Sequence, residues 1–249
     1  IYLIFTAGHT STDGVGLVRG DLCDEARWLA DILARLLRQR PPPVRGDGET
    51  GADGAATGAG SELAEVLGLL ALMAFTDARR DTRVDDDGHL VLLEDQDRSQ
   101  WDGDLIAEGR QLMAEAAAFE SLGPYQLQAT IAGIHSTAPT WDETDWRSIV
   151  WLYNRLVRLV PNAVIALNRA VAISMAVGPE AGLAAIDELA DSGHLDQYRY
   201  LHAARADLLR RLGRRDEAMA EYRQALELGG NEAEREFLEQ RLAELDEPG

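Results

Sequence analysis

A helix–turn–helix pattern that recurs near the C-terminus restricts the fold of this chain more than any other feature. Residues 200–245 read as helix, short turn, helix, turn and helix, and Gly213 is placed to end the first of them. Residues 168–190 repeat the first two of these helices about 36 residues earlier. In both stretches, small residues and larger apolar residues recur at helical spacing. The recurrence predicts helical hairpins that stack on one another along the chain.

The hairpins match the tetratricopeptide pattern, in which small residues lie where two helices touch and a bulky ring fills the space between them. Ala206 and Ala218 take small positions in the last hairpin, and Tyr222 supplies the ring. Asn231 is a candidate N-cap for a polar final helix, which suits the end of such an array. The predicted fold class is all-α, a tetratricopeptide-like helical-hairpin solenoid with a short β-hairpin insertion. An irregular helical bundle with only two genuine repeats is the alternative.

Toward the N-terminus the repeats become degenerate, but helix pairs can still be traced. Five pairs and a capping helix are expected, and the pairs in the first part of the chain join residues 1–7 with 21–39, 61–80 with 105–121, and 124–136 with a helix inside 144–162. The chain is expected to form one continuous domain in two regions. These are a degenerate repeat region, 1–160, with insertions at 45–60 and 79–104, and a region of tetratricopeptide-like repeats with the capping helix, 161–249.

The two insertions differ in character. Residues 45–60 are too polar and too rich in glycine to pack, and we expect a loop there. The second insertion contains Asp87-Gly88, a strong signal for a two-residue turn, between Val84 and the apolar stretch 91–93. This pattern predicts a short β-hairpin whose apolar face packs on neighbouring helices, since an isolated hairpin is marginally stable.

The second insertion leads into LLEDQDRSQWD, residues 92–102, for which three interpretations compete. A metal site is disfavoured because the carboxylates do not follow the spacing of a calcium loop. Catalysis is disfavoured because no nucleophile, phosphate loop or cofactor fingerprint accompanies them. No catalytic residue, metal ligand or cofactor is therefore predicted.

The favoured interpretation of this stretch is structural. Asp97 or Ser99 is expected to cap backbone amides, and Arg98 to pair with nearby acids. Trp101 is expected to bury its ring between helices. A loop fixed in this way can also present Gln96 and Arg98 to a partner.

The charge balance excludes some classes of partner. The chain carries 43 acidic residues against 24 basic ones, all of them arginine, and its net charge is −19. Such a balance argues against direct binding to a nucleic-acid backbone, which requires clustered cations. The single cysteine, Cys23, cannot form an internal disulfide and fits a cytoplasmic protein. No apolar stretch approaches the roughly 18 residues that a membrane span requires.

Several stretches together resemble the C-terminal extension of extracytoplasmic-function (ECF) RNA polymerase sigma factors that carry a tetratricopeptide-like tail. The resemblance covers nearly the whole chain, and its most specific part is the DQDRS stretch. The glycine-rich insertion at 45–60 is its chief departure. The matching segments are VRGDLCDEARWLA, LVLLEDQDRSQWD, GPYQLQATIAGIHS, ALNRAVAISMAVGPEAGL and LHAARADLLRRLGRRDEA.

The resemblance implies a regulatory protein-interaction domain that modulates transcription initiation in the bacterial cytoplasm and is not an enzyme. The implied partners are the N-terminal sigma regions of the same protein and the RNA polymerase core, with a small YCII-like protein as a further partner class. The alternative is a helical-repeat domain that senses a small molecule or a peptide. The expected loop residues are Asp95, Gln96, Asp97, Arg98, Ser99, Trp101 and Asp102. The expected groove residues are Tyr125, Gln128, Asn168, Arg169 and Arg205.

Overall fold

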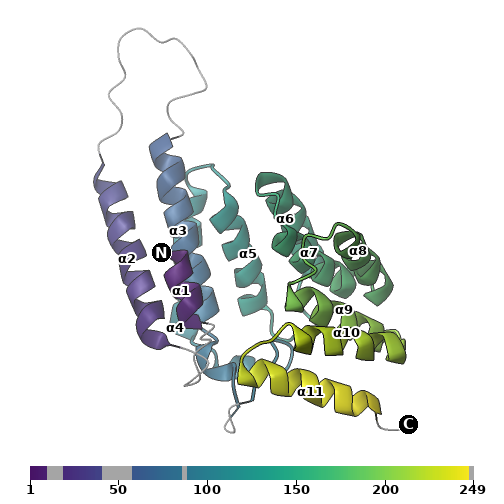
Figure 1. The fold of residues 1–249 in the computed structure, drawn as a ribbon. Coiled ribbons are helices and arrows are strands. Elements are labelled where there is room, and N and C mark those ends of the chain that lie inside the picture. The colour runs from purple at the N-terminus through teal and green to yellow at the C-terminus, as the bar shows by residue number, and fades with distance from the viewer. Residues whose placement is uncertain (10–18, 41–57, 86–88, 247–249) are drawn as a thin grey trace. The chain divides into compact units, whose positions relative to one another are not determined.

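The protein is all-helical, as its sequence predicts (Figure 1). The computed structural model describes residues 1–9, 19–40, 58–85 and 89–246. These residues form eleven α-helices and two short 3-10 helices, and no strand is found among them. None of the helices described is long and apolar enough to cross a membrane.

Contacts divide the chain into two compact units. The N-terminal unit holds the described residues of 1–81 and 97–141, and the C-terminal unit holds those of 82–96 and 142–246. The main division therefore lies near residue 141, ahead of the helix that starts at Trp146. The boundary expected from the sequence lies later, after residue 160.

The N-terminal unit is built around one helix that is apolar on all sides. The unit contains α1 (Tyr2–His9), α2 (Gly20–Gln39), α3 (Gly58–Asp77), α4 (Gly103–Ala117) and α5 (Pro124–Thr137). α3 contacts α2, α4 and α5, and every residue from Leu67 to Phe75 is buried. A helix buried on all faces needs apolar residues on all faces, which explains why this segment shows no polar stripe.

Small residues allow the neighbours of α3 to approach it closely. α2 turns Cys23, Ala26, Ala30 and Ala34 inward, at the three- and four-residue spacing of one helix face. At Gly68 of α3, a Cβ atom would lie 2.7 Å from the backbone nitrogen of Gln126. The first turn of α5 can therefore rest on α3 only because position 68 has no side chain.

The C-terminal unit is a succession of helices, each of which contacts the next. They are α6 (Trp146–Leu159), α7 (Ala163–Ala176), α8 (Pro179–Asp191), α9 (Arg199–Arg211), α10 (Arg215–Glu227) and α11 (Glu232–Asp246). Tyr222 is 2% exposed and packs with Ala206, Ala225 and Leu238. Gly213 follows α9 with a φ of +73°, a conformation that glycine adopts at helix ends without strain.

Four of the five helix pairs expected from the sequence are contacting neighbours: α1–α2, α3–α4, α7–α8 and α9–α10. The remaining pair is different, because α5 packs on α3 and α6 packs on α7. The helical spacing of apolar residues located both helices correctly, but it did not identify the helices against which they pack.

The predicted β-hairpin in the second insertion is not confirmed, because the residues described there form no strand. Among the residues described there, the only pairing is an isolated antiparallel bridge between Val84 and Leu90. The amide of Val91 donates to the carbonyl of Arg83 (2.9 Å), but the amides of Asp95 and Gln96 then donate back to Leu92, so the chain turns instead of extending. The expected turn at Asp87-Gly88 lies outside the described residues. So does the first insertion up to residue 57, while 58–60 begin α3.

Candidate functional site

Asp97, the third residue of the DQDRS stretch, organises a turn. One carboxylate oxygen of Asp97 accepts hydrogen bonds from the amide (2.9 Å) and hydroxyl (2.7 Å) of Ser99, and the other accepts from the Gln100 side chain (2.9 Å). These bonds lower the pKa of the Asp97 carboxyl, with the Ser99 side chain as the largest cause. Asp97 thus caps a 3-10 helix, η2 (Arg98–Gln100), as the sequence indicated.

Arg98 corrects one expectation, because it bonds to carbonyl groups and not to acids. Its Nη1 donates to the carbonyls of His135 (2.6 Å) and Ala138 (2.9 Å) at the C-terminal end of α5. The last carbonyls of a helix have no partner within it, and a guanidinium satisfies two of them here. The guanidinium also lies over the ring of Trp101, 5.0 Å from its centroid. Burial lowers the pKa of Arg98.

The end of the stretch is tied to two helices. Trp101 is 7% exposed. The amide of Asp102 donates to the carbonyl of Ala78 just after α3 (2.8 Å), and its carboxylate accepts from the amides of Asp104 and Leu105 as the N-cap of α4. Residues 97–102 therefore fix the ends of α3, α4 and α5 within the N-terminal unit.

The two residues before Asp97 belong to the C-terminal unit. Gln96 is buried, where its side chain donates to the carbonyl of Val91 (3.1 Å) and accepts from Thr82 (3.3 Å). Asp95 is exposed. Next to it, burial raises the pKa of the Glu94 carboxyl, and the charges of Asp95 and Asp207 add to that effect. Of the expected contact residues, Asp95, Asp97 and Ser99 face solvent, whereas Gln96 and Trp101 do not.

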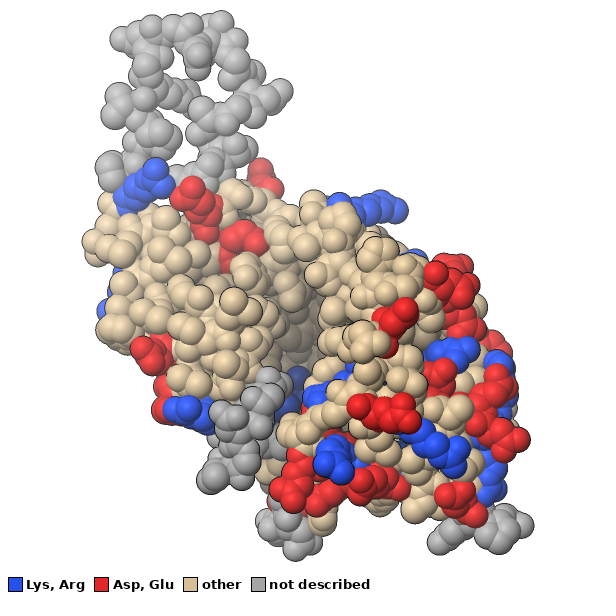
Figure 2. All heavy atoms as spheres, in the orientation of Figure 1, with Lys and Arg blue, Asp and Glu red and all other residues tan. Residues whose placement is uncertain are grey.

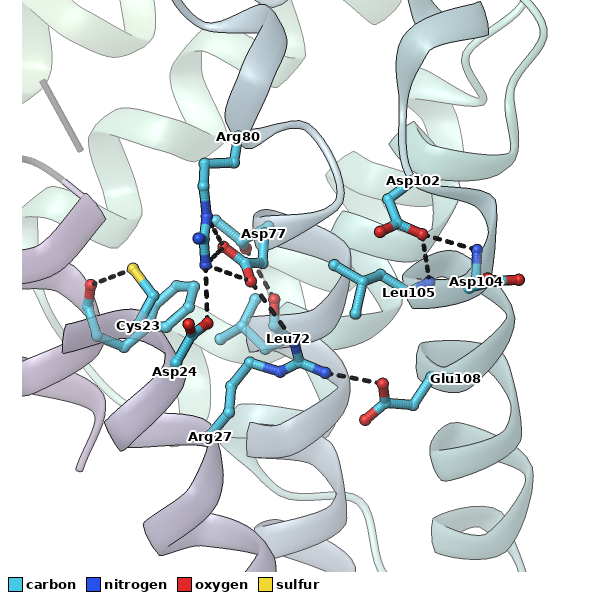
Figure 3. A network of polar contacts seen from close by, with 12 residues as sticks. Cys23, Asp24, Arg27, Leu72, Asp77, Arg80, Asp102, Asp104, Leu105 and Glu108 are labelled. Carbon is cyan, nitrogen blue, oxygen red and sulfur yellow. Dashed lines mark hydrogen bonds and ion pairs between the residues drawn. The ribbon is translucent and has the colours of Figure 1, made fainter. Parts of the chain in front are cut away.

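An ionic network centred on the buried carboxylate of Asp77 joins α2, α3 and α4, and no local sequence signal points to it (Figure 3). The side chain of Asp77 is 3% exposed and accepts two bonds from Arg80, at 2.7 and 2.8 Å. Arg27 lies 3.5 Å from the same carboxylate and 2.7 Å from Glu108 on α4. Arg80 also reaches Asp24 on α2, at 3.2 Å. Burial alone would lower the pKa of Arg80, but its bond with Asp77 raises that pKa above the ordinary value.

The network suits a structural role better than a chemical one. Each carboxylate and guanidinium in it is paired with an opposite charge, which leaves no free acid, base or nucleophile. Cys23 beside it is buried and directs its thiol at the carbonyl of Phe5. Across the described residues, no group of three or more metal-binding side chains is arranged to hold an ion.

The expected groove residues are divided between the two units. In the N-terminal unit, Tyr125 packs edge-on against Tyr2, and Gln128 donates to the carbonyl of Pro124. The other three belong to the C-terminal unit. There Asn168 is exposed, the Nε of Arg169 donates to Asn154 (2.6 Å), and Arg205 pairs with Asp187 on α8 and Glu221 on α10.

The distribution of charge also differs between regions. Figure 2 shows red and blue side chains gathered over the helices at the C-terminal end of the chain, while the part of this face formed by α1, α2 and α3 is largely uncharged. Many of the acids in the C-terminal unit are paired with arginines of the same unit, as in the bonds between Arg214 and Glu217 and between Arg210 and Asp207.

Comparison with known proteins gives a partial family match and one long relative. Residues 1–46 and 55–117 match the family model described as "Family of unknown function (DUF6596)". An uncharacterized protein of Rhizobium meliloti (strain 1021) is 38% identical over 245 residues, which cover 98% of this chain and 52% of the relative. The chain spans about half the length of that curated relative. No solved structure matches. The chain is thus similar along nearly all of its length to an uncharacterized bacterial protein, and in its first 117 residues to a family of unknown function.

Proposed function

We propose that this chain is the regulatory protein-interaction domain of an ECF sigma factor, which modulates transcription initiation in the cytoplasm through contacts with the sigma regions, the RNA polymerase core or both. The observation that carries the proposal is the LLEDQDRSQWD stretch, residues 92–102, whose sequence resembles that of such domains. Its geometry supports a contact role, because hydrogen bonds to backbone carbonyls fix residues 97–102 within the N-terminal unit while Asp97 and Ser99 face solvent. Asp95, which belongs to the C-terminal unit, is exposed as well. A loop that is already ordered before binding loses little conformational entropy when it binds.

The helix pairs support a tetratricopeptide-like assignment for the repeats. In α9 and α10, Ala206, Ala218 and Ala225 are fully buried where the helices meet, and Tyr222 fills the space between them. Arrays of such hairpins commonly serve as binding surfaces for peptides and helices. We extend this assignment to the degenerate pairs α1–α2 and α3–α4.

Charge and length are also compatible with the proposal. A net charge of −19 favours partners with basic surfaces, and DNA-binding sigma regions are of that kind. The Rhizobium meliloti relative extends well beyond the segment that this chain matches, so a protein of that length has room for sigma regions. A small YCII-like protein is a further candidate partner.

The proposal is tested by capture on the immobilised chain. We would offer it the N-terminal sigma regions and the core polymerase separately, at about 50 and 200 mM salt. The loop variant is Asp95→Arg, because Asp95 is exposed. The matched control is Glu236→Arg, which makes the same charge change on α11.

We expect capture of the sigma regions that weakens with salt, is lost in Asp95→Arg and persists in Glu236→Arg. Capture of polymerase alone would assign the domain to polymerase docking. Capture of neither partner would contradict the proposal and favour the alternative, a helical-repeat sensor of a small molecule or peptide. A ligand-dependent rise in melting temperature would then be the next measurement.

A further inference from the structure

One face of α6 carries cations and an aromatic ring in a row. Arg147, Trp151, Arg155 and Arg158 follow one another at spacings of four, four and three residues, which places them on a single helix face. All four are exposed, and Trp151 is 53% exposed. We call these four residues the arginine–tryptophan face. About three turns of helix make the row roughly 16 Å long.

Among the described residues, Arg155 and Arg158 have no carboxylate partner, and Arg147 lies near one acid, Asp145, whose pKa is lowered by side-chain hydrogen bonding and also by the charge of Arg147. Elsewhere twelve arginines form ion pairs, including Arg27 and Arg80 in the N-terminal unit and Arg205 in the C-terminal unit. The reason lies in the sequence, because residues 146–179 contain four arginines and no acidic residue. In a chain of net charge −19, this segment is a local patch of positive charge.

Apolar surface accompanies the positive charge. The guanidinium of Arg155 lies over the Trp151 ring at 5.0 Å from the centroid, which holds the ring against the helix face. Next to it is an open hollow of about 490 Å³ lined by Arg147, Val150, Ala176 and Val177. Val177 is 73% exposed. Large apolar side chains kept in solvent beside unpaired cations are typical of a contact surface.

We propose that the arginine–tryptophan face binds an acidic amphipathic helix of a protein partner. Carboxylates spaced one turn apart on such a helix match the row of arginines, and its aliphatic side chains would enter the hollow beside Val177. A nucleic acid supplies the charge but no aliphatic groups for the hollow, and its long array of phosphates would meet the acidic remainder of the chain. The site shares no residue with the 92–102 stretch.

The test uses the full chain and a fluorescein-labelled helical peptide of about 18 residues, with glutamate and leucine on one face. Binding is followed by fluorescence anisotropy at low and moderate salt. The test variants are Arg155→Glu combined with Arg158→Glu, and Trp151→Ala. The matched control reverses two other exposed arginines, Arg110 on α4 and Arg223 on α10, to glutamate. Circular dichroism melting of every variant confirms that it is folded.

We expect salt-sensitive binding that weakens about tenfold or more in the α6 double variant, since reversing two charges removes at least one pairing and adds repulsion. Trp151→Ala should also weaken it, and the control should not. The proposal is overturned if the α6 variants bind as the unmodified chain does. It is equally overturned if a peptide with serine in place of leucine binds as well, or if a single-stranded oligonucleotide binds more tightly. Asp95→Arg should leave peptide binding unchanged, so failure of the loop proposal and failure of this one are distinguishable.

Discussion

Arginine side chains have different roles in the N-terminal unit and on α6. In the N-terminal unit, Arg27 and Arg80 converge on the buried carboxylate of Asp77 and connect three helices. On α6, Arg155 and Arg158 stand in solvent without a carboxylate partner among the described residues. The difference comes from the acids within reach and not from the arginines. A paired guanidinium holds the fold, while an unpaired one stays available to another molecule.

The largest loss of stability is expected when the carboxylate of Asp77, at the centre of the ionic network, is removed. Asp77→Ala should cost about 3–5 kcal/mol of stability, because it leaves two arginines near a buried site without their common partner. Urea denaturation measures the loss. Asp81→Ala, an exposed acid four residues away, is the control and should change stability little. Equal effects from the two variants would mean that the network does not hold the helices together.

A second test uses the cations around His135, whose ring stacks on Trp141. Burial, with a smaller contribution from the nearby charges of Arg79 and Arg98, lowers the pKa of His135 to about 4. The unfolded chain, with the ordinary pKa of 6.5, binds a proton more readily than the folded one between these values. Stability should therefore fall by ~2–3 kcal/mol as the pH drops from about 6.5 to 4. His135→Phe should flatten that part of the stability–pH curve, and an unchanged slope would contradict the assignment.

A third test concerns Arg98, which among the described residues bonds to backbone carbonyls instead of an acid. Arg98→Ala should destabilise the protein by about 2 kcal/mol, because two helix-end carbonyls and the face of Trp101 lose their partner. Arg98→Lys should recover only part of this, since an ammonium cannot reproduce the planar group. Thermal melting gives the comparison. Full recovery by lysine would show that charge alone suffices at this position.

The smallest change in stability is expected from substitutions on α6. Arg155→Glu combined with Arg158→Glu should change stability by less than about 0.5 kcal/mol, because both side chains are exposed and make no ion pair with a described residue. The same variants should strongly affect peptide binding. A large fall in melting temperature would show that these arginines hold the fold after all, and the contrast with Arg27 and Arg80 would disappear.

Local features of the fold were predictable from the sequence because they depend on residues a few positions apart. Helix periodicity gave the all-α class, and Asn231 was identified as an N-cap, which the bond from the amide of Glu234 to its side chain confirms (2.9 Å). Asp97 as a cap and Trp101 as a buried ring belong to the same group. Short-range spacing determines each of these features.

Features that depend on distant residues were not predictable in this way. Arg27 and Asp77 lie fifty positions apart, and nothing in either segment indicates that they meet. The bond from Arg98 to the end of α5 spans about forty residues. The predicted β-hairpin is not confirmed beyond one isolated bridge, since a local turn signal does not determine strand length, which depends on the surface against which a strand packs.

The order in which the chain visits its two units has a consequence for how such a protein can evolve. Residues 82–96 of the C-terminal unit are inserted between segments of the N-terminal unit, so the described chain passes from one unit to the other after residues 81, 96 and 141. A single breakpoint or proteolytic cut after residue 141 leaves every segment of the N-terminal unit in one piece, but it separates residues 82–96 from the rest of the C-terminal unit. The C-terminal unit therefore depends on a segment that lies within the sequence of the N-terminal unit, and it cannot be exchanged whole by one breakpoint.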